Sequence, residues 1–526
     1  MSLRKDGGRA AAARPFDRLL IANRGEIAVR IIRACRELGI ESIAVYSDAD
    51  AAAVHVRAAD RAVRIGAAAA AESYLRVDAI MAAAAESGAQ AIHPGYGFLS
   101  EQPALADACT AAGIVFVGPG RETLVSLGNK LAARHRANLA GVPVVPGTFE
   151  PLPVGNEADG AKFEQEAARI GFPVLVKAAA GGGGRGMRRV DNPADLGDAV
   201  AAAAREAQAS FGDGAVYLER YVERARHVEV QLLGDSDGTV VALGERDCST
   251  QRRHQKLVEE APAPSLTEGQ RRTLHELGVK VARTVGLRNA ATAEFLLTPD
   301  GEFWFLEVNA RLQVEHGVTE LVADLDLVHE QLWIATGAPL SERVLAAAAT
   351  AATPQRHAIE VRLSAEDPAH DFAPAPGTLT AWLTPAGPGV RVDAGVEEGS
   401  VVSPNYDPLL AKLMVVAEDR PRAIARLVRA LDEFVIGGVQ TTLPFHRWLV
   451  DQPGFAAAAD LSTDFVARKW QPAEVVPVAA LRAAELAALT TRDRAVTSNP
   501  AAALTNGHTA PNWWRAGIAE ATDTLR

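Results

Sequence analysis

Residues Ala291–Glu320 read ATAEFLLTPDGEFWFLEVNARLQVEHGVTE, and the rest of the chain is organised around them. Two alternating apolar runs flank Thr298-Pro299-Asp300-Gly301, whose residue types favour a turn. The pattern predicts a β-hairpin. With an even number of loop residues centred on Pro299-Asp300, Glu294 would lie opposite Phe305, whereas an odd number would place the acids of the two strands on opposite faces.

Acidic and amide side chains gather on one face of this hairpin. Glu307 and Asn309 share the face of Phe305, because side chains alternate along a strand. Glu294 would be a diagonal neighbour of Glu307, roughly 7–8 Å away at the backbone. These oxygen ligands suit Mg²⁺, which leaves coordination positions for phosphates. The following Arg311-Leu-Gln-Val-Glu-His316 offers groups that can bind and deprotonate a small oxyanion. A solvated, charged hairpin edge is the alternative.

Composition excludes several classes of protein. The 526 residues predict several domains, and 65 acidic against 54 basic residues give a net charge of −11, which argues against general nucleic-acid binding. Three widely spaced cysteines form neither a disulfide framework nor a metal knuckle, so a cytoplasmic location is expected. No apolar run reaches the ~18 residues of a membrane span, and residues 1–15, expected to be disordered, lack a secretory signal.

The N-terminal part begins with strand, helix and strand. Arg18–Asn23 and Glu41–Tyr46 are apolar runs, and residues from Gly25 keep helical spacing. This order predicts a parallel, doubly wound sheet. The turn at Asn23–Glu26 does not match G-x-G-x-x-G, so a dinucleotide site there is not expected.

A second unit ends in Ala91–Glu101 (AIHPGYGFLSE). Its Gly and Pro residues predict a loop that holds His93, Tyr96 and Glu101 at the carboxyl edge of the sheet, where ligands of such sheets bind. A purely structural tight turn fits the spacing equally well.

A glycine-rich segment follows the hinge at 141–156. Phe172–Lys177 predicts a strand, and AAAGGGGRGM occupies residues 178–187. A strand, not a helix, follows its G-x-G-x-x-G, and the Walker pattern fails, so neither a dinucleotide fingerprint nor a P-loop is present. We expect a lid whose backbone N–H groups close over phosphates, with Lys177 supplying a cation. A plain linker is the alternative.

Polar residues also concentrate between the lid and the hairpin. Ala215–Val222 predicts a strand that could meet an adenine edge, and His227, Glu229 and Gln231 alternate onto one strand face. A solvated loop is the default interpretation of the polar and basic run Glu245–Lys256. Its place between the lid and the metal hairpin favours a segment that lines an anionic active site.

The character of the sequence changes at His357. Glu360 and Arg362 share a strand face, and short strands between Gly and Pro breaks predict an α+β C-terminal domain. The loop at 402–408 would present Asp407. Two tryptophans, Trp513-Trp514, lie in the tail and either dock on the body or await a partner.

From about Phe16 to Trp470 the chain resembles biotin carboxylase, the ATP-grasp component of acetyl-CoA, acyl-CoA and pyruvate carboxylases. The motifs that carry the resemblance are IANRGEIAVRIIRACRELGI, AIHPGYGFLSE, KAAAGGGGRGM, RHVEVQ, ERDCSTQRRHQKLVEEAPAP, AEFL, EVNARLQVEH and SPNYDPLLAKL. The resemblance implies an α/β and α+β ATP-grasp fold. Its expected parts are a disordered terminus (1–15), a doubly wound N-terminal domain (16–130), an ATP-grasp domain (131–350) with a mobile lid (about 145–218), a C-terminal domain (351–470) and a possible partner-docking tail (471–526).

The family's chemistry is ATP-dependent phosphorylation of bicarbonate to carboxyphosphate, whose CO₂ is captured by N1 of biotin. By resemblance, the nucleotide is held by Lys130, Lys177, Gly182, Gly183, Gly184, Glu219, His227, Gln251 and His254. Two Mg²⁺ or Mn²⁺ ions are held by Glu294, Glu307 and Asn309. Bicarbonate is bound by Lys256, Arg311, Gln313 and Val314 (through its backbone). The remaining roles are the general base Glu315, the enolate-stabilising Arg362, and Tyr96 and Asp407 beside biotin.

Departures from the family pattern are few: Ala180 in the lid, Arg220 after Glu219, and Ala293 and Gly317 beside the metal strand and base loop. None removes a catalytic group. No methionine precedes a lysine, so the M-K-M-type biotinylation site is absent from the sequence. We therefore expect biotin on a separate carrier protein, a carboxyltransferase partner, and a homodimer or larger complex resembling acyl-CoA carboxylases.

Two rival functions are compatible with parts of the sequence. Another ATP-grasp ligase, of the carboxyaminoimidazole-synthase or carbamoyl-phosphate type, would share the lid and metal residues but gives no reason for Arg362. An inactive scaffold protein would bind nucleotide without turnover. The intact Lys256, Glu294 and Glu315 argue against the scaffold.

Overall fold

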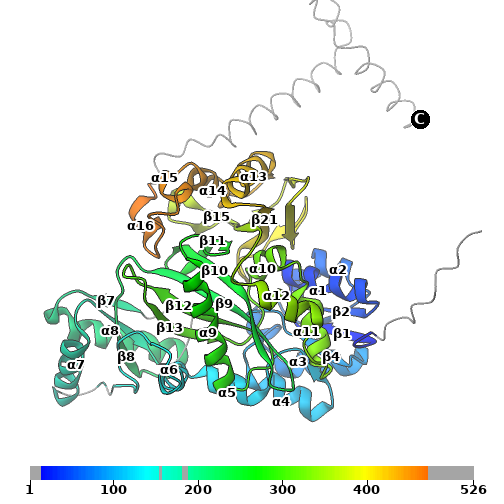
Figure 1. Cartoon of the computed structure of the whole chain (residues 1–526). Coiled ribbons are helices and arrows are strands. Elements are labelled where there is room, and N and C mark those ends of the chain that lie inside the picture. The colour runs from blue at the N-terminus through cyan, green and yellow to red at the C-terminus, as the bar shows by residue number, and fades with distance from the viewer. Residues whose placement is uncertain (1–13, 153, 155–156, 180–186, 472–526) are drawn as a thin grey trace, which may run out of the picture. The chain divides into compact units, whose positions relative to one another are not determined.

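The computed structural model describes residues 14–152, 154, 157–179 and 187–471 (Figure 1). The expectations for the N-terminal tail, for lid residues Gly182, Gly183 and Gly184, and for the tail with Trp513 and Trp514 lie outside the described residues. Within the described part of the chain, no helix is long and apolar enough to cross a membrane.

The N-terminal part is the predicted parallel, doubly wound sheet. Its strand order is β3-β2-β1-β4-β5, all pairs parallel. The strands are β1 (Arg18–Ile21), β2 (Glu41–Ser47), β3 (Arg61–Gly66), β4 (Ala91–His93) and β5 (Val115–Phe116). The helices are α1 (Gly25–Leu38), α2 (Val54–Ala58), α3 (Val77–Ser87), α4 (Pro103–Ala112) and α5 (Arg121–Gly128), with 3₁₀ turns at Asp48–Asp50 and Ala70–Glu72. Helix α1 ends where predicted, because Gly39 adopts the left-handed conformation (φ 68°) that lets the chain turn into β2.

A small separate sheet lies within the segment predicted to be the lid (about 145–218). After α6 (Lys130–Leu139), the antiparallel sheet β7-β6-β8 is formed by Arg188–Val190, Val174–Ala178 and Val216–Arg220. Helices α7 (Glu157–Ile170) and α8 (Leu196–Phe211) flank it, with a 3₁₀ turn at Pro193–Asp195. Its own apolar cluster includes Phe163, Val174 and Leu218, so this layer has a core distinct from that of the large sheet.

One antiparallel sheet of eight strands connects the middle of the chain to its C-terminal part. Its order is β13-β12-β9-β10-β11-β14-β21-β19. The strands are β9 (Arg226–Gly234), β10 (Val240–Arg252), β11 (Gln255–Ala261), β12 (Asn289–Leu297), β13 (Phe303–Asn309), β14 (His357–Ser364), β19 (Val390–Ala394) and β21 (Leu409–Ala417). Strand β11 pairs with β14, as in Val258 opposite Val361, so the sheet runs on without a break.

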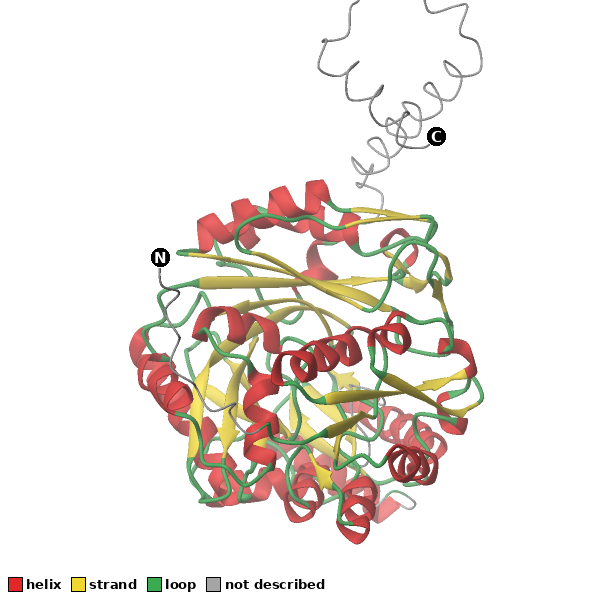
Figure 2. Ribbon diagram, turned by 90° about the vertical axis from the view of Figure 1, so that its right-hand side faces the viewer, coloured by secondary structure: helices red, strands yellow, loops and turns green. Residues whose placement is uncertain are grey.

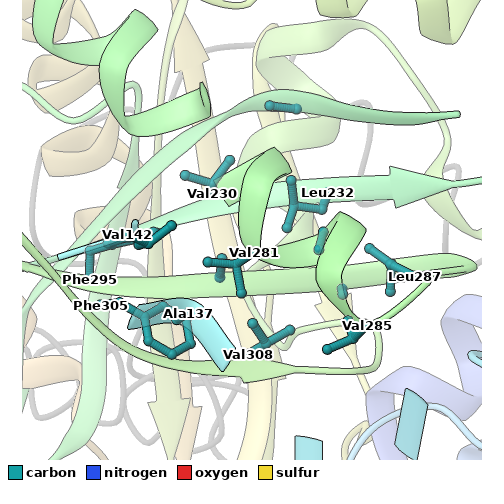
Figure 3. Close-up of a cluster of buried hydrophobic side chains, with 14 of the residues drawn as sticks. Ala137, Val142, Val230, Leu232, Val281, Val285, Leu287, Phe295, Phe305 and Val308 are labelled. Carbon is teal, nitrogen blue, oxygen red and sulfur yellow. The ribbon is translucent and has the colours of Figure 1, made fainter. Parts of the chain in front are cut away.

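Helix α9 (Glu268–Thr284) covers one end of this sheet and fills its core. Thr267 and Gln270 form a capping box at its start, which fixes the first turn. Figure 3 shows Val281 and Val285 among Val230, Leu232 and other apolar side chains of the strands. This packing immobilises β9 and β12, whose polar faces contribute to the candidate site.

The remaining elements complete the C-terminal half. Helices lie against the sheets throughout the described chain (Figure 2). The remaining helices are α10 (His316–Ala323), α11 (Leu327–Ala335), α12 (Glu342–Thr350), α13 (Arg420–Glu433), α14 (Leu443–Val450), α15 (Pro453–Ala456) and α16 (Phe465–Lys469). Short strand pairs are β15 (Glu366–Asp367) with β16 (Ala373–Pro374), β17 (Gly377–Thr378) with β20 (Val401–Val402), and β18 (Ala381–Leu383) with β22 (Val435–Gly437), and a 3₁₀ turn spans Pro368–His370. The predicted α+β character is confirmed.

The central hairpin has a different register from the predicted one. Its loop, residues 298–302, has an odd number of residues, and Phe305 pairs with Phe295 rather than with Glu294. A register shift follows, in which one residue of β13 is left unpaired, and Glu294 then lies directly opposite Glu307. An odd loop alone would have placed Glu294 and Glu307 on opposite faces of the hairpin, and this bulge returns them to the same face.

The expectation that Glu307 and Asn309 share the face of Phe305 was therefore wrong. Beyond the unpaired residue the core-facing positions change from Phe303 and Phe305 to Val308, so Glu307 and Asn309 lie on the opposite face.

The default interpretation of residues 245–256 as a solvated loop does not hold, because this run belongs to the hairpin of β10 and β11. Only Arg253 and His254 form the turn, with φ of 47° and 67°. The polar residues are tolerated in strands because they find partners inside: Arg246 is fully buried and donates to Glu229 at 2.5 Å and to Gln231 at 2.7 Å. Arg246 and its partners therefore belong to a buried hydrogen-bond network and are not exposed to solvent.

A buried carboxylate on β11 predicts acid sensitivity of the fold. Glu260 accepts hydrogen bonds from Arg420 at 2.7 Å and contacts His357 at 2.9 Å. Burial opposes ionisation, but these partners prevail and lower the pKa of Glu260 to about 2. A lowered pKa contributes stability that is complete above the unfolded-state pKa and is lost as the pH falls from about 4.5 to about 2.

We expect Glu260→Gln to lower the free energy of unfolding at pH 7 by about 3 kcal/mol, since it breaks a buried ion pair. Urea unfolding across pH 2–7 should also show a shallower acid limb in this variant. Glu418→Gln, which removes an exposed pair with Arg422, should change neither quantity appreciably. An unchanged acid limb in Glu260→Gln would contradict the assignment.

Candidate active site

Lys256 lies at the centre of the polar cluster on the large sheet. It comes from β11, and its Nζ lies 2.5 Å from Glu229, 2.7 Å from Glu315 and 3.3 Å from Glu294. Burial disfavours the ammonium, but the surrounding acidic groups outweigh it and raise the pKa of Lys256 well above its usual value. Lys256 is therefore a permanent buried cation, aimed at the acids of three neighbouring segments.

Glu315 is held between two cations. Its Oε1 accepts from Lys256, and its Oε2 accepts from Arg362 of β14 at 2.9 Å. Burial would raise the pKa of Glu315, but Lys256, Arg362 and Arg246 hold it well below the usual range. The carboxylate is fully buried and ionised, so it is ready to accept a proton.

Arg362 has a second acidic partner, Glu259 of β11. Its Nε donates to Glu259 Oε1 at 2.7 Å. Burial raises the pKa of Glu259 to about 7, despite the opposing effect of Arg362. Burial also disfavours the charged guanidinium, but these acids keep the pKa of Arg362 raised. Sequence reasoning missed Glu259, which is one of two consecutive glutamates that point to opposite faces.

The predicted metal ligands are brought together on the hairpin face. Asn309 donates to Glu294 at 2.7 Å, and Lys130 lies 2.7 Å from Glu307. His227 Nε2 is 3.0 Å from Glu294, in an ion-pair contact that lacks hydrogen-bond alignment. Burial would lower the pKa of His227, yet Glu294 raises it.

The donor set on this face fits a hard divalent cation. Two directly opposed carboxylates, Glu294 and Glu307, and the amide of Asn309 supply oxygen atoms on one strand face. Burial opposes ionisation of Glu294, but Lys256 and His227 lower its pKa, so the ligand is anionic at neutral pH. Such few, charged oxygens suit Mg²⁺ or Mn²⁺ bound together with phosphates.

Several predicted nucleotide residues lie on the small sheet β7-β6-β8 and on the strands of the large sheet. Lys177 donates to Glu219 at 2.8 Å, and the buried Arg134 also pairs with Glu219. Burial lowers the pKa of His254, and Lys177 adds to the effect. Gln251 lies buried in β10, where its amide makes a 3.4 Å contact with a backbone carbonyl. Arg134 gave no sequence signal, because it stands in a helix with other basic residues.

The loop Ala91–Glu101 reaches the site at its end. Glu101 accepts from Arg311 at 3.0 Å and from the backbone N–H of Ala310 at 3.1 Å. Arg311 also donates to Gln313 at 3.0 Å, so the guanidinium is fixed beside Val314 and Glu315. His93, by contrast, is buried and its Nδ1 accepts from the backbone of Gly95 at 3.0 Å, which is a turn-stabilising role.

Tyr96 and Asp407 are less directly connected. Tyr96 donates to Glu26 of α1, and burial together with Glu26 raises its pKa well above normal. Asp407 is exposed and accepts from the backbone N–H of Leu409 at 2.9 Å. The charges of Arg362 and Asp407 also act on the pKa of Tyr96, which places the three residues in one neighbourhood.

Gly317, which departs from the family pattern, has a local explanation. A Cβ built at Gly317 would lie 2.2 Å from the sulfur of Met414. The long Met414 side chain of β21 thus occupies the space that a larger residue at 317 would take. The absence of a side chain at 317 therefore leaves room for Met414 beside the first turn of α10.

Nearly the whole described chain is similar to known proteins. Three family models match: biotin carboxylase, N-terminal domain (residues 15–124), carbamoyl-phosphate synthase L chain, ATP binding domain (129–343), and biotin carboxylase C-terminal domain (360–468). Among curated relatives, biotin carboxylase of Nostoc sp. is 49% identical over 454 residues, covering 86% of this chain and 98% of the relative.

Another curated relative carries the name of a carboxylase component. The biotin-dependent acyl-coenzyme A carboxylase alpha3 subunit of Mycobacterium leprae is 46% identical over 453 residues, which cover 86% of this chain and 74% of the relative.

Solved structures agree with the fold. A biotin carboxylase–ATP complex from Campylobacter jejuni has a TM-score of 0.81 at 44% identity, covering 86% of this chain and 99% of that one. The biotin carboxylase domain dimer of Hydrogenobacter thermophilus 2-oxoglutarate carboxylase, with MgADP, ADP and bicarbonate, also has a TM-score of 0.81, at 41% identity and with 86% and 97% covered.

Proposed function

Since the chain belongs to the biotin carboxylase family of ATP-grasp ligases, we propose that it carboxylates N1 of biotin with bicarbonate at the expense of ATP. The observation that carries the proposal is the position of Glu315, a buried ionised carboxylate held between Lys256 and Arg362. Lys256 also contacts Glu294, which is a proposed metal ligand on the nucleotide side of the site. Arg362 comes from β14, among the C-terminal strands. The arrangement provides one base for bicarbonate and one cation for the biotin step.

ATP would bind between the lid and the large sheet. Lys177 and Lys130 neutralise phosphate charge, and Glu219, His227, Gln251 and His254 line the nucleotide. Glu294, Glu307 and Asn309 would hold the metal ions, which when bound neutralise and align the phosphates. Gly182, Gly183 and Gly184 are proposed to close over the phosphates. Arg134, paired with Glu219, orients that carboxylate.

Bicarbonate would lie against Lys256, Arg311, Gln313 and the backbone of Val314. Glu315 removes its proton, an oxygen of the resulting carbonate attacks the γ-phosphorus, and the bond to ADP breaks. A carboxylate with a lowered pKa is a weak base in isolation. Lys256 and Arg311 offset this, because the cations that stabilise the Glu315 carboxylate also stabilise the carbonate dianion.

Carboxyphosphate then releases CO₂ and phosphate within the same site. The phosphate released in this step accepts the N1 proton of biotin, and an enolate-like anion forms on the ureido oxygen. Arg362 is proposed to stabilise that charge, with Tyr96 and Asp407 beside the ring. N1 then forms a bond to the carbon of CO₂, which accepts the electron pair.

We further propose that biotin arrives on a biotin carboxyl carrier protein and that a carboxyltransferase consumes the product. The name of the Mycobacterium leprae relative, an alpha3 subunit of a biotin-dependent carboxylase, supports a place in a multi-subunit carboxylase. A homodimer is proposed by analogy with the dimeric domain among the solved structures.

The test is bicarbonate-dependent ADP release from purified protein with Mg²⁺, with and without free biotin. We expect no ADP release without bicarbonate, stimulation by biotin, and loss of activity when EDTA removes the metal, since the phosphates then lack neutralising charge. Restoration by excess Mg²⁺ or Mn²⁺ is the control.

The other outcomes separate the rival functions. Turnover with an amine substrate and without biotin would indicate another ATP-grasp ligase. Binding of ATP without turnover, even with an added carrier protein, would indicate a scaffold protein and would refute the proposal.

A further inference from the structure

A buried lysine on β21 takes no part in the steps above. Lys412 stands in the apolar strand Leu409–Ala417, and its side chain is fully buried. A buried ammonium is costly unless charged and polar partners surround it. Burial would lower the pKa of Lys412, but nearby acidic groups, Glu26 foremost, outweigh this and raise it, so the group is cationic.

The partners of Lys412 belong to different parts of the chain. Its Nζ donates to the carbonyl oxygen of Val314 at 2.7 Å and lies 3.3 Å from Glu26 Oε1. Val314 immediately precedes Glu315. Glu26, on α1 of the N-terminal sheet, accepts the hydrogen bond of Tyr96. The Lys412 ammonium on β21 therefore contacts two further parts of the chain. One is the segment that carries Glu315, and the other is helix α1, whose Glu26 accepts the hydrogen bond of Tyr96.

We propose that Lys412 is a positioning residue for the carboxylation reaction. Through the Val314 carbonyl it fixes the segment of Arg311, Gln313 and Glu315, and through Glu26 it fixes Tyr96. The inference rests on the proposed function, because it assigns bicarbonate to this segment and biotin to Tyr96.

The geometry explains why such a brace is needed. Segment 310–315 contains no strand or helix, so its backbone is not held by a ladder of hydrogen bonds. Yet Glu315 must keep both carboxylate oxygens at 2.7 Å and 2.9 Å from cations on two different strands. A charge-assisted bond to the preceding carbonyl restricts this backbone, and displacements near ~1 Å are enough to slow a reaction markedly.

A purely structural role would be the neutralisation of buried acids. Glu360 needs no cation for that purpose: neither of its oxygens has a hydrogen-bond partner among the described residues, and burial raises its pKa well above normal, which favours the neutral acid. Glu26 is the carboxylate within ion-pair distance of Lys412. Removing Glu26 and Lys412 together therefore separates charge balance from positioning.

The experiment compares wild type, Lys412→Met, Glu26→Gln and the double variant by thermal unfolding and by bicarbonate-dependent ADP release. Lys412→Met should lower the Tm, and the double variant should regain most of it, because no unpaired charge remains. In Lys412→Met and in the double variant the KM for bicarbonate should be raised about tenfold, while the KM for ATP stays near the wild-type value. Glu26→Gln alone should raise the KM for biotin.

Two further proteins keep the proposal testable if Lys412→Met does not fold. Lys412→Arg keeps the charge but displaces the donor nitrogen, so it should fold and still raise the KM for bicarbonate. Arg420→Met, a buried cation that pairs with Glu260 on the other face of β11, should lower the Tm without changing that KM.

Restoration of the wild-type KM for bicarbonate in the double variant, or a wild-type KM in Lys412→Arg, would overturn the proposal and leave Lys412 a charge-balancing residue. Absence of bicarbonate-dependent turnover in the wild-type protein would instead refute the proposed function.

Discussion

The Glu315→Gln variant should lose bicarbonate-dependent ADP release by about 10²–10⁴-fold, the range expected for removal of a general base. Glutamine keeps the shape of the side chain and can still contact Lys256 and Arg362, but it cannot take the proton of bicarbonate. Because the pKa of Glu315 lies well below its usual value, the base is ionised throughout the neutral range. Lowering the pH from about 8 to about 6 should therefore not mimic the variant.

The measurement is steady-state ADP release together with ATP affinity by calorimetry. ATP affinity should be nearly unchanged, since Glu315 is not among the residues proposed to hold the nucleotide. Glu330→Gln, at a half-buried glutamate that accepts from Ser341 away from the site, is the matched control and should retain full activity. Wild-type turnover in Glu315→Gln would exclude Glu315 as the base.

Arg362→Met should uncouple the two halves of the reaction. Carboxybiotin formation should fall by about 10²–10³-fold, the loss typical of removing a group that stabilises charge only in the transition state. ADP release should fall much less, because Glu315 keeps its 2.7 Å contact with Lys256. The ratio of carboxybiotin formed to ATP cleaved is the quantity to measure, with free biotin as acceptor.

Arg362→Lys distinguishes charge from geometry. Lysine retains a cation but cannot bind Glu259 and Glu315 with the spaced nitrogens of a guanidinium, so partial recovery of coupling is expected. An equal loss of ADP release and carboxybiotin formation in Arg362→Met would show that this residue acts only by holding Glu315.

The sequence allowed most of the fold to be predicted wherever periodicity and glycine placement agree. The β-α-β opening, the end of α1 at Gly39 and the strand of Glu360 and Arg362 were expected and found. The hairpin register was not, because Phe303–Leu306 is apolar at every position and so hides the point at which the bulge shifts the alternation. The strands within the run 245–256 were not predicted, because its buried polar side chains belong to a network that depends on tertiary contacts.

The sequence likewise allowed some residues of the candidate site to be predicted and not others. Residues inside the distinctive strings, such as Lys256, Arg311 and Glu315, were identifiable from the sequence, and the structure brings them together. Arg134, Arg246, Glu259 and Lys412 were not, because each acts through a partner that is remote in sequence. For Lys412 the sequence did offer one indication: it is a single lysine within an otherwise apolar strand, Leu409–Ala417.

The continuity of the eight-stranded sheet bears on how this enzyme can be divided. Family models end and begin between residues 343 and 360, which suggests a boundary at which the chain could be cut. A fragment that stopped there would strip β14 from β11 and leave the strand that carries Lys256 as an unpaired edge, open to association with other chains. The catalytic half is thus not a transplantable module, and engineered chimeras should exchange both halves as one piece.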